Sequence, residues 1–124
     1  LTIKNDDLQE LIIPQNLEII FHGMVNEIKV NELYEKSTFA IFPSLNESFG
    51  LPLIESVNHN CKVIASDLPY VHEIIQPSLT FDPYSVESIS NSIIKAVSVN
   101  LPKTKILIEN KLVNFINYSI NQDV

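Results

Sequence analysis

Residues Pro43 to Glu55 read PSLNESFGLPLIE, and this stretch predicts the fold of the chain around it. The residues directly before it, from Phe39 to Phe42, read FAIF and form an apolar run with the length of a buried strand. After Gly50 comes Leu-Pro and then a segment with helical apolar spacing. Proline is tolerated at the first helical position, because its missing N–H would be unpaired there anyway. We therefore expect a strand, a tight loop and a helix that begins at Pro52, which together form half of a β-α-β unit.

The loop before this expected helix carries groups that can bind an anion or a sugar. A helix N-terminus presents unpaired N–H groups and a partial positive charge. Gly50 has no Cβ, so a ligand can approach its backbone closely, and the amides of Phe49, Gly50 and Leu51 are available to phosphate or sugar oxygens. Glu55 is expected in the first helical turn, where its carboxylate can accept hydrogen bonds from the vicinal hydroxyls of a ribose. Glu47 lies on the loop, on the ligand side.

The same two glutamates also allow an interpretation without a function. Glu47 and Glu55 have seven residues between them, which is a common spacing. In this interpretation Glu55 only satisfies the helix dipole, and Glu47 is a solvated loop residue. The spacing alone leaves both interpretations open.

The whole string is more specific than its parts. The pattern Pro-Ser-x-x-Glu-x-Phe-Gly-Leu-Pro-x-x-Glu resembles the E-x7-E signature of retaining, nucleotide-sugar-dependent glycosyltransferases of the GT-B fold, the large family-4 group. In that family the segment lies in the C-terminal, donor-binding Rossmann-like domain. The resemblance continues upstream, where a strand ending in Phe-x-Gly (residues 21–23) and the pair Leu33-Tyr34 also match.

The resemblance implies a role for each matched residue. Glu47 would face the donor sugar near the reacting carbon and is therefore the predicted catalytic residue. Glu55 would bind the ribose hydroxyls of the donor nucleotide, and the backbone from Phe49 to Leu51 would touch sugar hydroxyls and phosphate. The predicted donor-binding residues are Ser48, Phe49, Gly50, Leu51 and Glu55. No metal and no cofactor are expected, and the implied small-molecule partner is the nucleoside-diphosphate sugar itself.

Composition limits the remaining classes of protein. With 124 residues, of which 45% are hydrophobic, the chain has room for one domain at most and enough apolar residues for a core. The net charge is −7, with eight lysines and no arginine, which argues against a nucleic-acid partner. No apolar run approaches the roughly 20 residues of a membrane-spanning helix, and no signal peptide opens the chain. We expect a cytoplasmic setting, at the inner membrane face only if regions outside this chain attach it there.

Cysteine and histidine give no sign of a metal or a disulfide. Cys61 is the single cysteine and has apolar neighbours, so we expect a small core residue rather than a nucleophile. The three histidines, His22, His59 and His72, do not have the spacing of metal ligands.

The other expected elements alternate between strand and helix. In order they are the tail of a helix over Leu1–Ile13, a strand over Leu17–Phe21, a short helix after Val30 within residues 25–36, a strand over Val63–Ala65, a short helix over Tyr70–Gln76, a last strand over Leu79–Phe81, a helix capped by Ser85 and a final helix over Lys103–Ile120. Asn60 is expected to end the helix of the signature in a left-handed conformation. This order predicts an α/β fold with a Rossmann-like parallel sheet, flanking helices and a ligand at the carboxyl ends of the strands.

The helix after Ser85 carries an apolar stripe. Val86, Ile89, Ile93 and Val97 recur at near-helical spacing, so we expect them to pack on the sheet.

Transfer from a nucleotide sugar requires the diphosphate leaving group to be stabilised. Related enzymes do this with an Arg and a Lys from early in the donor domain, whereas this chain has no Arg. We therefore expect residues 1–124 to be part of the C-terminal nucleotide-sugar-binding domain of a longer glycosyltransferase, without its early donor region and acceptor domain, and inactive alone. The full enzyme would transfer a hexosyl unit to an acceptor hydroxyl with retention, in polysaccharide, lipopolysaccharide or glycoconjugate biosynthesis. Its acceptor, a sugar or glycolipid, would bind the absent N-terminal domain. The other hypothesis is a non-catalytic module of the same fold that binds a partner protein.

Overall fold

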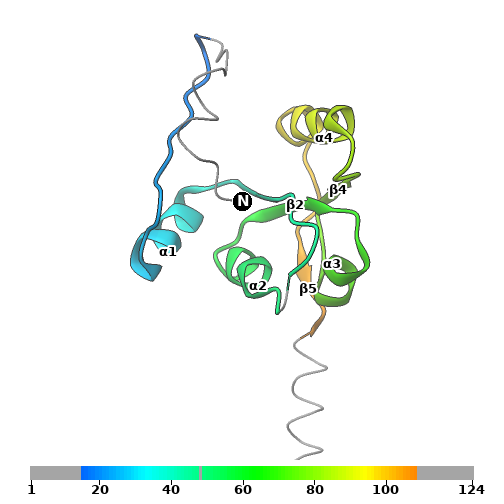
Figure 1. Cartoon of the computed structure of the whole chain (residues 1–124), viewed down its shortest axis with the longest axis horizontal. Helices are drawn as coiled ribbons and strands as arrows, with labels where there is room; N and C mark the ends of the chain where they lie inside the picture. The colour runs from blue at the N-terminus through cyan, green and yellow to red at the C-terminus, as the bar shows by residue number, and fades with distance from the viewer. Residues whose placement is uncertain (1–14, 48, 109–124) are drawn as a thin grey trace, which may run out of the picture.

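A computed structural model describes residues 15–47 and 49–108, which form a parallel sheet with helices on both faces (Figure 1). The elements in chain order are α1 (Glu27–Lys36), β1 (Phe39–Phe42), α2 (Leu51–Asn58), β2 (Lys62–Ser66), α3 (Pro69–Ile74), β3 (Ile75–Gln76), β4 (Leu79–Phe81), α4 (Val86–Ser98) and β5 (Lys105–Ile106). The three strands of the main sheet lie in the order β1-β2-β4 and are parallel, and β3 pairs with β5 in a separate antiparallel ribbon. The expected α/β, Rossmann-like class is confirmed.

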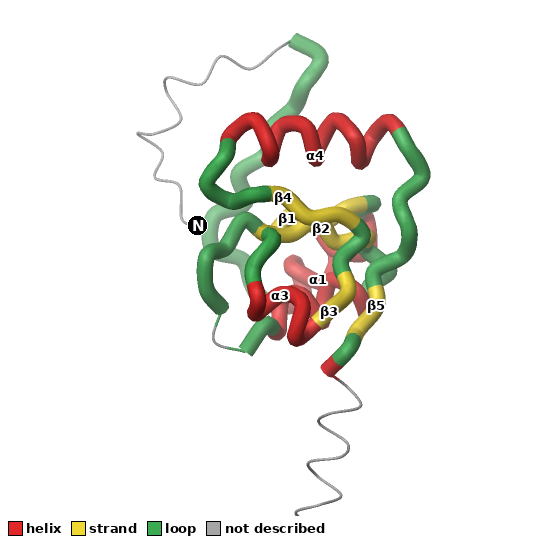
Figure 2. The backbone as a smooth tube through the Cα atoms, turned by 90° about the vertical axis from the view of Figure 1, so that its right-hand side faces the viewer, coloured by secondary structure: helices red, strands yellow, loops and turns green. Residues whose placement is uncertain are grey.

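The middle strand, β2, places the core on both faces of the sheet. Val63 and Ala65 point to one face, where they join a cluster with residues of α2 and α3. Ile64 points to the other face and packs against Phe81 and against Ala96 of α4. Figure 2 shows α4 on one side of the sheet and α3 on the other. A strand that is covered on both faces is a continuous apolar run, which is why this segment was recognisable in the sequence.

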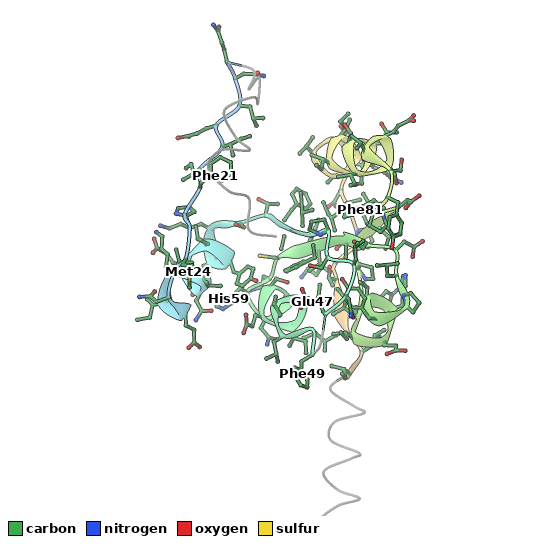
Figure 3. All side chains as sticks on the ribbon, in the orientation of Figure 1. Phe21, Met24, Glu47, Phe49, His59 and Phe81 are labelled. Carbon is green, nitrogen blue, oxygen red and sulfur yellow. The ribbon has the colours of Figure 1, made fainter. Side chains whose placement is uncertain are left out.

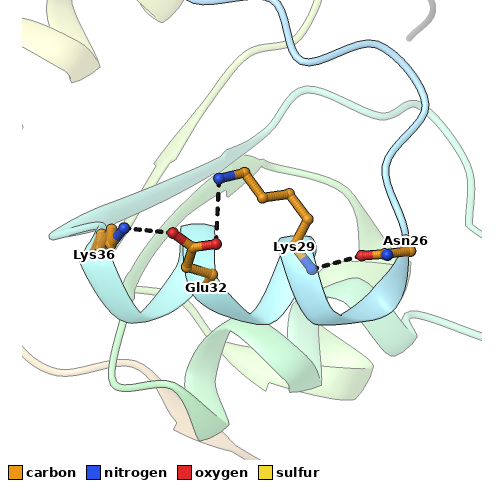
Figure 4. Close-up of polar contacts among 4 residues, drawn as sticks. All are labelled: Asn26, Lys29, Glu32 and Lys36. Atoms are coloured by element: carbon orange, nitrogen blue, oxygen red, sulfur yellow. Dashed lines mark hydrogen bonds and ion pairs between the residues drawn. The ribbon is translucent and has the colours of Figure 1, made fainter.

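The helix α1 begins earlier than expected, because Asn26 caps it. The Asn26 side chain accepts a hydrogen bond from the Lys29 amide at 2.9 Å, so the helix starts at Glu27 rather than after Val30. Figure 4 shows this cap together with the pairing of Glu32 with Lys29 and Lys36 along the helix. The hydrogen bonds from Lys36 and then Lys29 hold the pKa of the Glu32 carboxyl below its usual value.

The strand expected over Leu17–Phe21 is wrong. No residue from 17 to 23 is in a strand, and Leu17, Ile20 and Phe21 have about half of their surface exposed. In Figure 1 this segment is the blue arm that runs from α1 away from the sheet. A β-rich sequence forms a strand only where a neighbouring strand pairs with its backbone, and among the described residues no strand lies beside this one.

The buried stripe expected on α4 is confirmed at Ile89, which packs against the core cluster, and is wrong for the other three residues. Val86 and Val97 are 84% and 75% exposed, whereas Ser92 and Ala96 are buried and Ile89 is half-buried. Each step of four residues turns a helix by about 40° beyond a full circle, so a stripe built from steps of four rotates away from the sheet. Ile89, Ser92 and Ala96 are spaced by three and then four residues, so they stay on one face of the helix. The small side chains of Ser92 and Ala96 let α4 lie close to β4.

The C-terminal part contains a ribbon that the sequence analysis missed. The expected helix over Tyr70–Gln76 ends at Ile74, because Ile75 and Gln76 pair with Ile106 and Lys105. The prediction that Leu79–Phe81 is the last strand is therefore wrong, and so is the expected helix where it covers residues 103–107. The Thr104 hydroxyl accepts a hydrogen bond from the Val63 amide at 2.8 Å and forms another with the Ser78 hydroxyl. These bonds hold the segment before β5 against β2. The rest of that expected helix, residues 109–120, and the expected helix tail over Leu1–Ile13 lie outside the described residues.

Candidate functional site

The loop after β1, residues 43–50, lies at the carboxyl end of the sheet, as expected for a ligand site. The neighbouring strand ends hold one another in place. The Ser66 hydroxyl donates to the Phe42 carbonyl at 3.3 Å, and the Asp67 amide donates to the Phe81 carbonyl at 2.8 Å. The loop therefore starts from a fixed base across β1, β2 and β4.

Gly50 ends the loop and caps α2. Its backbone is left-handed, with φ +64°, and its carbonyl accepts hydrogen bonds from the amides of Leu53 and Ile54 at 3.1 and 3.3 Å. The helix begins at Leu51, one residue earlier than expected. A Cβ on Gly50 would collide with the end of the Ile74 side chain, so the space beside this glycine is filled by α3. The left-handed backbone and the Ile74 side chain explain a glycine at this position, and the approach of a ligand to its backbone stays a prediction.

Glu55 lies in the second turn of α2, and the prediction that it lies in the first turn is wrong. The first turn contains no acidic residue, because the helix starts at Leu51 and makes Glu55 its fifth residue. The charge of a helix N-terminus acts mainly on the first turn. Satisfying the helix dipole is therefore no longer an adequate explanation for a glutamate at this position.

The Glu55 side chain is exposed on the side of α2 that faces α1. Burial raises the pKa of the Tyr34 hydroxyl, and the negative charge of Glu55, followed by that of Cys61, raises it further. The Tyr34 ring also stacks on His59, with ring centroids 5.9 Å apart. The charge of Glu55 thus acts on the tyrosine of a stacked tyrosine–histidine pair.

Glu47 faces the opposite side, toward α3. Burial raises the pKa of the Tyr70 hydroxyl, and the charge of Glu47 raises it further. Glu47 also lines a small cavity of about 160 Å³ with the residues from Phe49 to Pro52. Phe49 and Leu51 are 79% and 58% exposed, which gives this half-buried carboxylate apolar neighbours. Figure 3 shows Glu47 and Phe49 near α2, at the same end of the molecule.

The backbone amides at the start of α2 remain available. Among the described residues, no acceptor is recorded for the amides of Phe49, Gly50 and Leu51, and Pro52 has none to offer. A ligand oxygen in front of α2 would therefore meet donors that have no partner within residues 15–47 and 49–108, together with the positive end of the helix. Ser48, the other predicted donor-binding residue, lies outside the described residues.

Two tyrosines belong to this site that the sequence analysis did not assign to it. Tyr34 was noted there as part of the Leu-Tyr pair, and Tyr70 only as the start of a short helix. Tyr34 lies 21 positions before Glu55, and Tyr70 lies 23 positions after Glu47. Such separations carry no periodic signal, so only the fold shows that the charge of each glutamate acts on a tyrosine.

Cys61 is a core residue, as predicted. Its side chain is 3% exposed, and burial raises the pKa of its thiol. Within residues 15–47 and 49–108, no group of three or more His, Cys, Asp or Glu side chains could hold a metal ion. No helix in that same part of the chain is long and apolar enough to span a membrane.

The fold defines a Rossmann-like domain, and the loop before α2 is its candidate ligand site. The family model for glycosyl transferases group 1 matches residues 4–114, and the chain belongs to this family.

Three relatives from enteric bacteria share parts of the chain. The O-antigen chain mannosyltransferase RfbU of Salmonella typhimurium is 35% identical over 72 residues, which are 55% of this chain and 20% of the relative. The serotype-specific mannosyltransferase WbdA of Escherichia coli is 29% identical over 82 residues, 65% of this chain and 10% of the relative. The O-antigen chain mannosyltransferase B of Escherichia coli is 29% identical over 80 residues, which are 64% of this chain and 21% of the relative. The chain therefore matches a fifth or less of the first two relatives, and no solved structure matches it.

Proposed function

We propose that the protein carrying this chain is a retaining glycosyltransferase, in which these residues form part of the donor site. It transfers a mannosyl unit from a nucleoside-diphosphate sugar to an acceptor hydroxyl during assembly of an O-antigen or a similar polysaccharide. The family match and the mannosyltransferase relatives support the reaction and the sugar. The structural observation that carries the proposal is that Glu47 lies beside residues Phe49 to Pro52 in front of α2, with Glu55 exposed one turn into the same helix.

The two glutamates take different parts of the donor. When the bond between sugar and diphosphate breaks, positive charge develops at the anomeric carbon, and a nearby carboxylate stabilises it. Glu47, half-buried beside apolar side chains, has that role, because its charge is less screened by water there. Glu55 is exposed and accepts hydrogen bonds from the ribose hydroxyls.

The diphosphate between them needs positive charge. The amides of Phe49, Gly50 and Leu51 and the N-terminus of α2 supply part of it. The loop and α2 contain no lysine, so the proposal assigns the remaining charge to the Arg and Lys that related enzymes place early in the donor domain. No metal ion is included.

Two variants in the natural polypeptide that carries this chain test the assignment. Glu55→Gln should weaken binding of both the donor and the free nucleotide by roughly tenfold, because the loss of a charged hydrogen bond to a hydroxyl weakens binding by about this factor. Glu47→Gln should leave nucleotide binding nearly unchanged and lower kcat by roughly 10²-fold or more, as expected for a group that acts in the transition state. Proton NMR of the product should show the anomeric configuration of the donor.

The matched control is Glu87→Gln, which removes an exposed carboxylate from the first turn of α4, away from the loop. This variant should change neither the nucleotide affinity nor kcat. Unchanged nucleotide affinity in Glu55→Gln, or an inverted product, would contradict the proposal.

The alternative is a non-catalytic module of the same fold that binds a partner protein. The observation in its favour is the run of exposed apolar side chains before and within α1, in which Ile20, Met24 and Ile28 are 61%, 103% and 79% exposed. The same experiment separates the two functions, because such a module would turn over no nucleotide sugar and would bind its partner equally well as the Glu47→Gln variant.

A further inference from the structure

We propose that Tyr70 is a positioning residue for Glu47. Its hydroxyl holds the loop after β1 against α3 and thereby fixes where the Glu47 carboxylate stands. The inference rests on the proposed function in one respect, which is that Glu47 faces the donor sugar.

The contact joins two segments that are far apart in the chain. The Tyr70 hydroxyl donates a hydrogen bond to the Ser44 carbonyl at 2.8 Å, across 26 positions of sequence. It is the one hydrogen bond recorded between the loop residues 43–47 and any other side chain in the described part of the chain. The loop therefore depends on Tyr70 for its side-chain anchoring.

The anchor itself is rigid. Tyr70 is the second residue of α3, and its ring packs against the core cluster that includes Val71 and Ile74. Those two neighbours are 0% and 7% exposed, which leaves the ring little freedom.

One face of α3 holds both ends of the loop. Tyr70 and Ile74 are four residues apart and therefore lie on the same side of the helix. Tyr70 binds the loop at Ser44, and Ile74 fills the space beside Gly50 at its other end. Glu47 lies midway between these two fixed points, so the place of its carboxylate depends on both.

The charge of the Glu47 carboxylate also acts on the Tyr70 hydroxyl. Burial raises the pKa of Tyr70 and the charge of Glu47 raises it further, so the phenol keeps its proton and remains a donor at neutral pH. A phenylalanine at this position would keep the ring in the core and lose only the bond to the loop. The hydroxyl therefore fixes the position of the loop, whereas the ring packs against the core.

The test compares Tyr70→Phe with Tyr84→Phe in the 124-residue chain. Tyr84 is 76% exposed, and its hydroxyl has no recorded partner among the described residues, so this control removes a phenolic oxygen that holds nothing. Amide hydrogen exchange of Leu45, Asn46 and Glu47 should become about fivefold faster in Tyr70→Phe, the factor expected for the loss of one ordinary hydrogen bond. Tyr84→Phe should leave these rates unchanged.

Binding gives a readout that a purely structural role would not move. NMR titrations with UDP, GDP and ADP and with their glucose or mannose conjugates separate the nucleotide from the sugar. Tyr70→Phe should weaken binding of the nucleotide-sugar conjugate about fivefold more than binding of the free nucleotide, because only the sugar lies beside Glu47. Equal weakening of both, or unchanged loop exchange, would overturn the inference.

A ligand-free measurement separates this inference from the proposed function. In the chain with its native Tyr70, the pKa of that phenol, followed by its ring carbon shifts, should fall when Glu47→Gln removes the neighbouring charge. If no nucleotide binds the natural polypeptide that carries this chain, the donor-site proposal fails, while loop exchange and this titration still decide the contact. An unchanged pKa of Tyr70 in Glu47→Gln would show that the two side chains are not neighbours and would overturn the positioning role.

Discussion

Gly50 shows how one residue links the fold to the candidate site. Its left-handed backbone lets the loop turn into α2, and its missing side chain lets Ile74 approach. Both properties fix the start of the helix, and with it the direction of the amides in front of it. The glycine is thus a structural requirement of the site, and the proposed contact of its amide with a ligand comes in addition to that.

Replacing this glycine tests both requirements. Gly50→Ala should lower the free energy of unfolding by about 2–4 kcal/mol, since the left-handed conformation and the crowding at Ile74 both add a cost. Gly23→Ala is the matched control, because Gly23 has φ +61° and open space where the Cβ would be, and it should cost only about 1–2 kcal/mol. Urea unfolding measures both values.

A second substitution isolates the contact. Ile74→Val removes the atom that Gly50→Ala would strike, so the alanine should cost only the backbone strain of about 1–2 kcal/mol in that background. If Gly50→Ala costs the same in both backgrounds, Ile74 does not restrict this position.

Cys61 gives a prediction with a pH dependence. Because burial raises the pKa of its thiol, the folded state favours the neutral form, and this contribution to stability is present below the pKa of the unfolded thiol. It is lost as the pH rises through the higher pKa of the folded thiol. A thiol reagent at pH 8 should therefore label Cys61 slowly in the native chain and rapidly in urea. Native labelling as fast as that of an unfolded cysteine would contradict the burial.

At this scale, local chemistry was predictable and long-range contacts were not. The left-handed conformation of Asn60, with φ +63°, follows from its place after a helix, and the burial of Cys61 follows from its apolar neighbours. The bond from Tyr70 to Ser44 and the approach of Glu55 to Tyr34 depend on how the elements pack. The functional roles of Glu47 and Glu55 remain predictions.

Among the elements, the helix α4 separates what capping predicts from what periodicity predicts. The cap was predicted correctly, because Ser85 accepts the Ser88 amide at 3.1 Å and Glu87 lies in the first turn. The buried face was not, because small residues such as Ser92 and Ala96 carry little hydrophobic signal although they fit closest to the sheet. The largest apolar residues of a helix are therefore an unreliable guide where a helix packs closely.

The cap of α4 carries a measurable part of its stability. Ser85→Ala should lower the free energy of unfolding by about 1 kcal/mol, since it leaves the Ser88 amide without its partner. Ser90→Ala, an exposed position inside the same helix, should be neutral or stabilising by up to about 0.5 kcal/mol. Thermal unfolding followed by circular dichroism compares them, and equal effects would argue against the cap.

Across the whole molecule, the sequence predicted the central sheet and failed at its margins. The run Val63–Ala65 of β2 is recognisable because burial on both faces makes it continuously apolar, whereas β1 and β4 are only partly buried and were recognised from their short apolar composition. The segment Leu17–Phe21 has a similar composition but no neighbouring strand in the described chain, and the short ribbon of β3 and β5 depends on a contact between distant residues. Composition describes a strand, whereas pairing decides whether it forms.

The central claim is that the loop after β1 and the start of α2 bind a nucleotide sugar. The most direct measurement is an NMR titration of the 124-residue chain with GDP-mannose, GDP, UDP-glucose and ADP-glucose, followed at every assigned amide. The account predicts that one of these ligands shifts the amides of Glu47, Phe49, Gly50, Leu51 and Glu55, and that Glu55→Gln removes the response. The result that would contradict it is a response confined to other residues, such as the groove beside β4 and α4, with the amides from Glu47 to Glu55 unmoved.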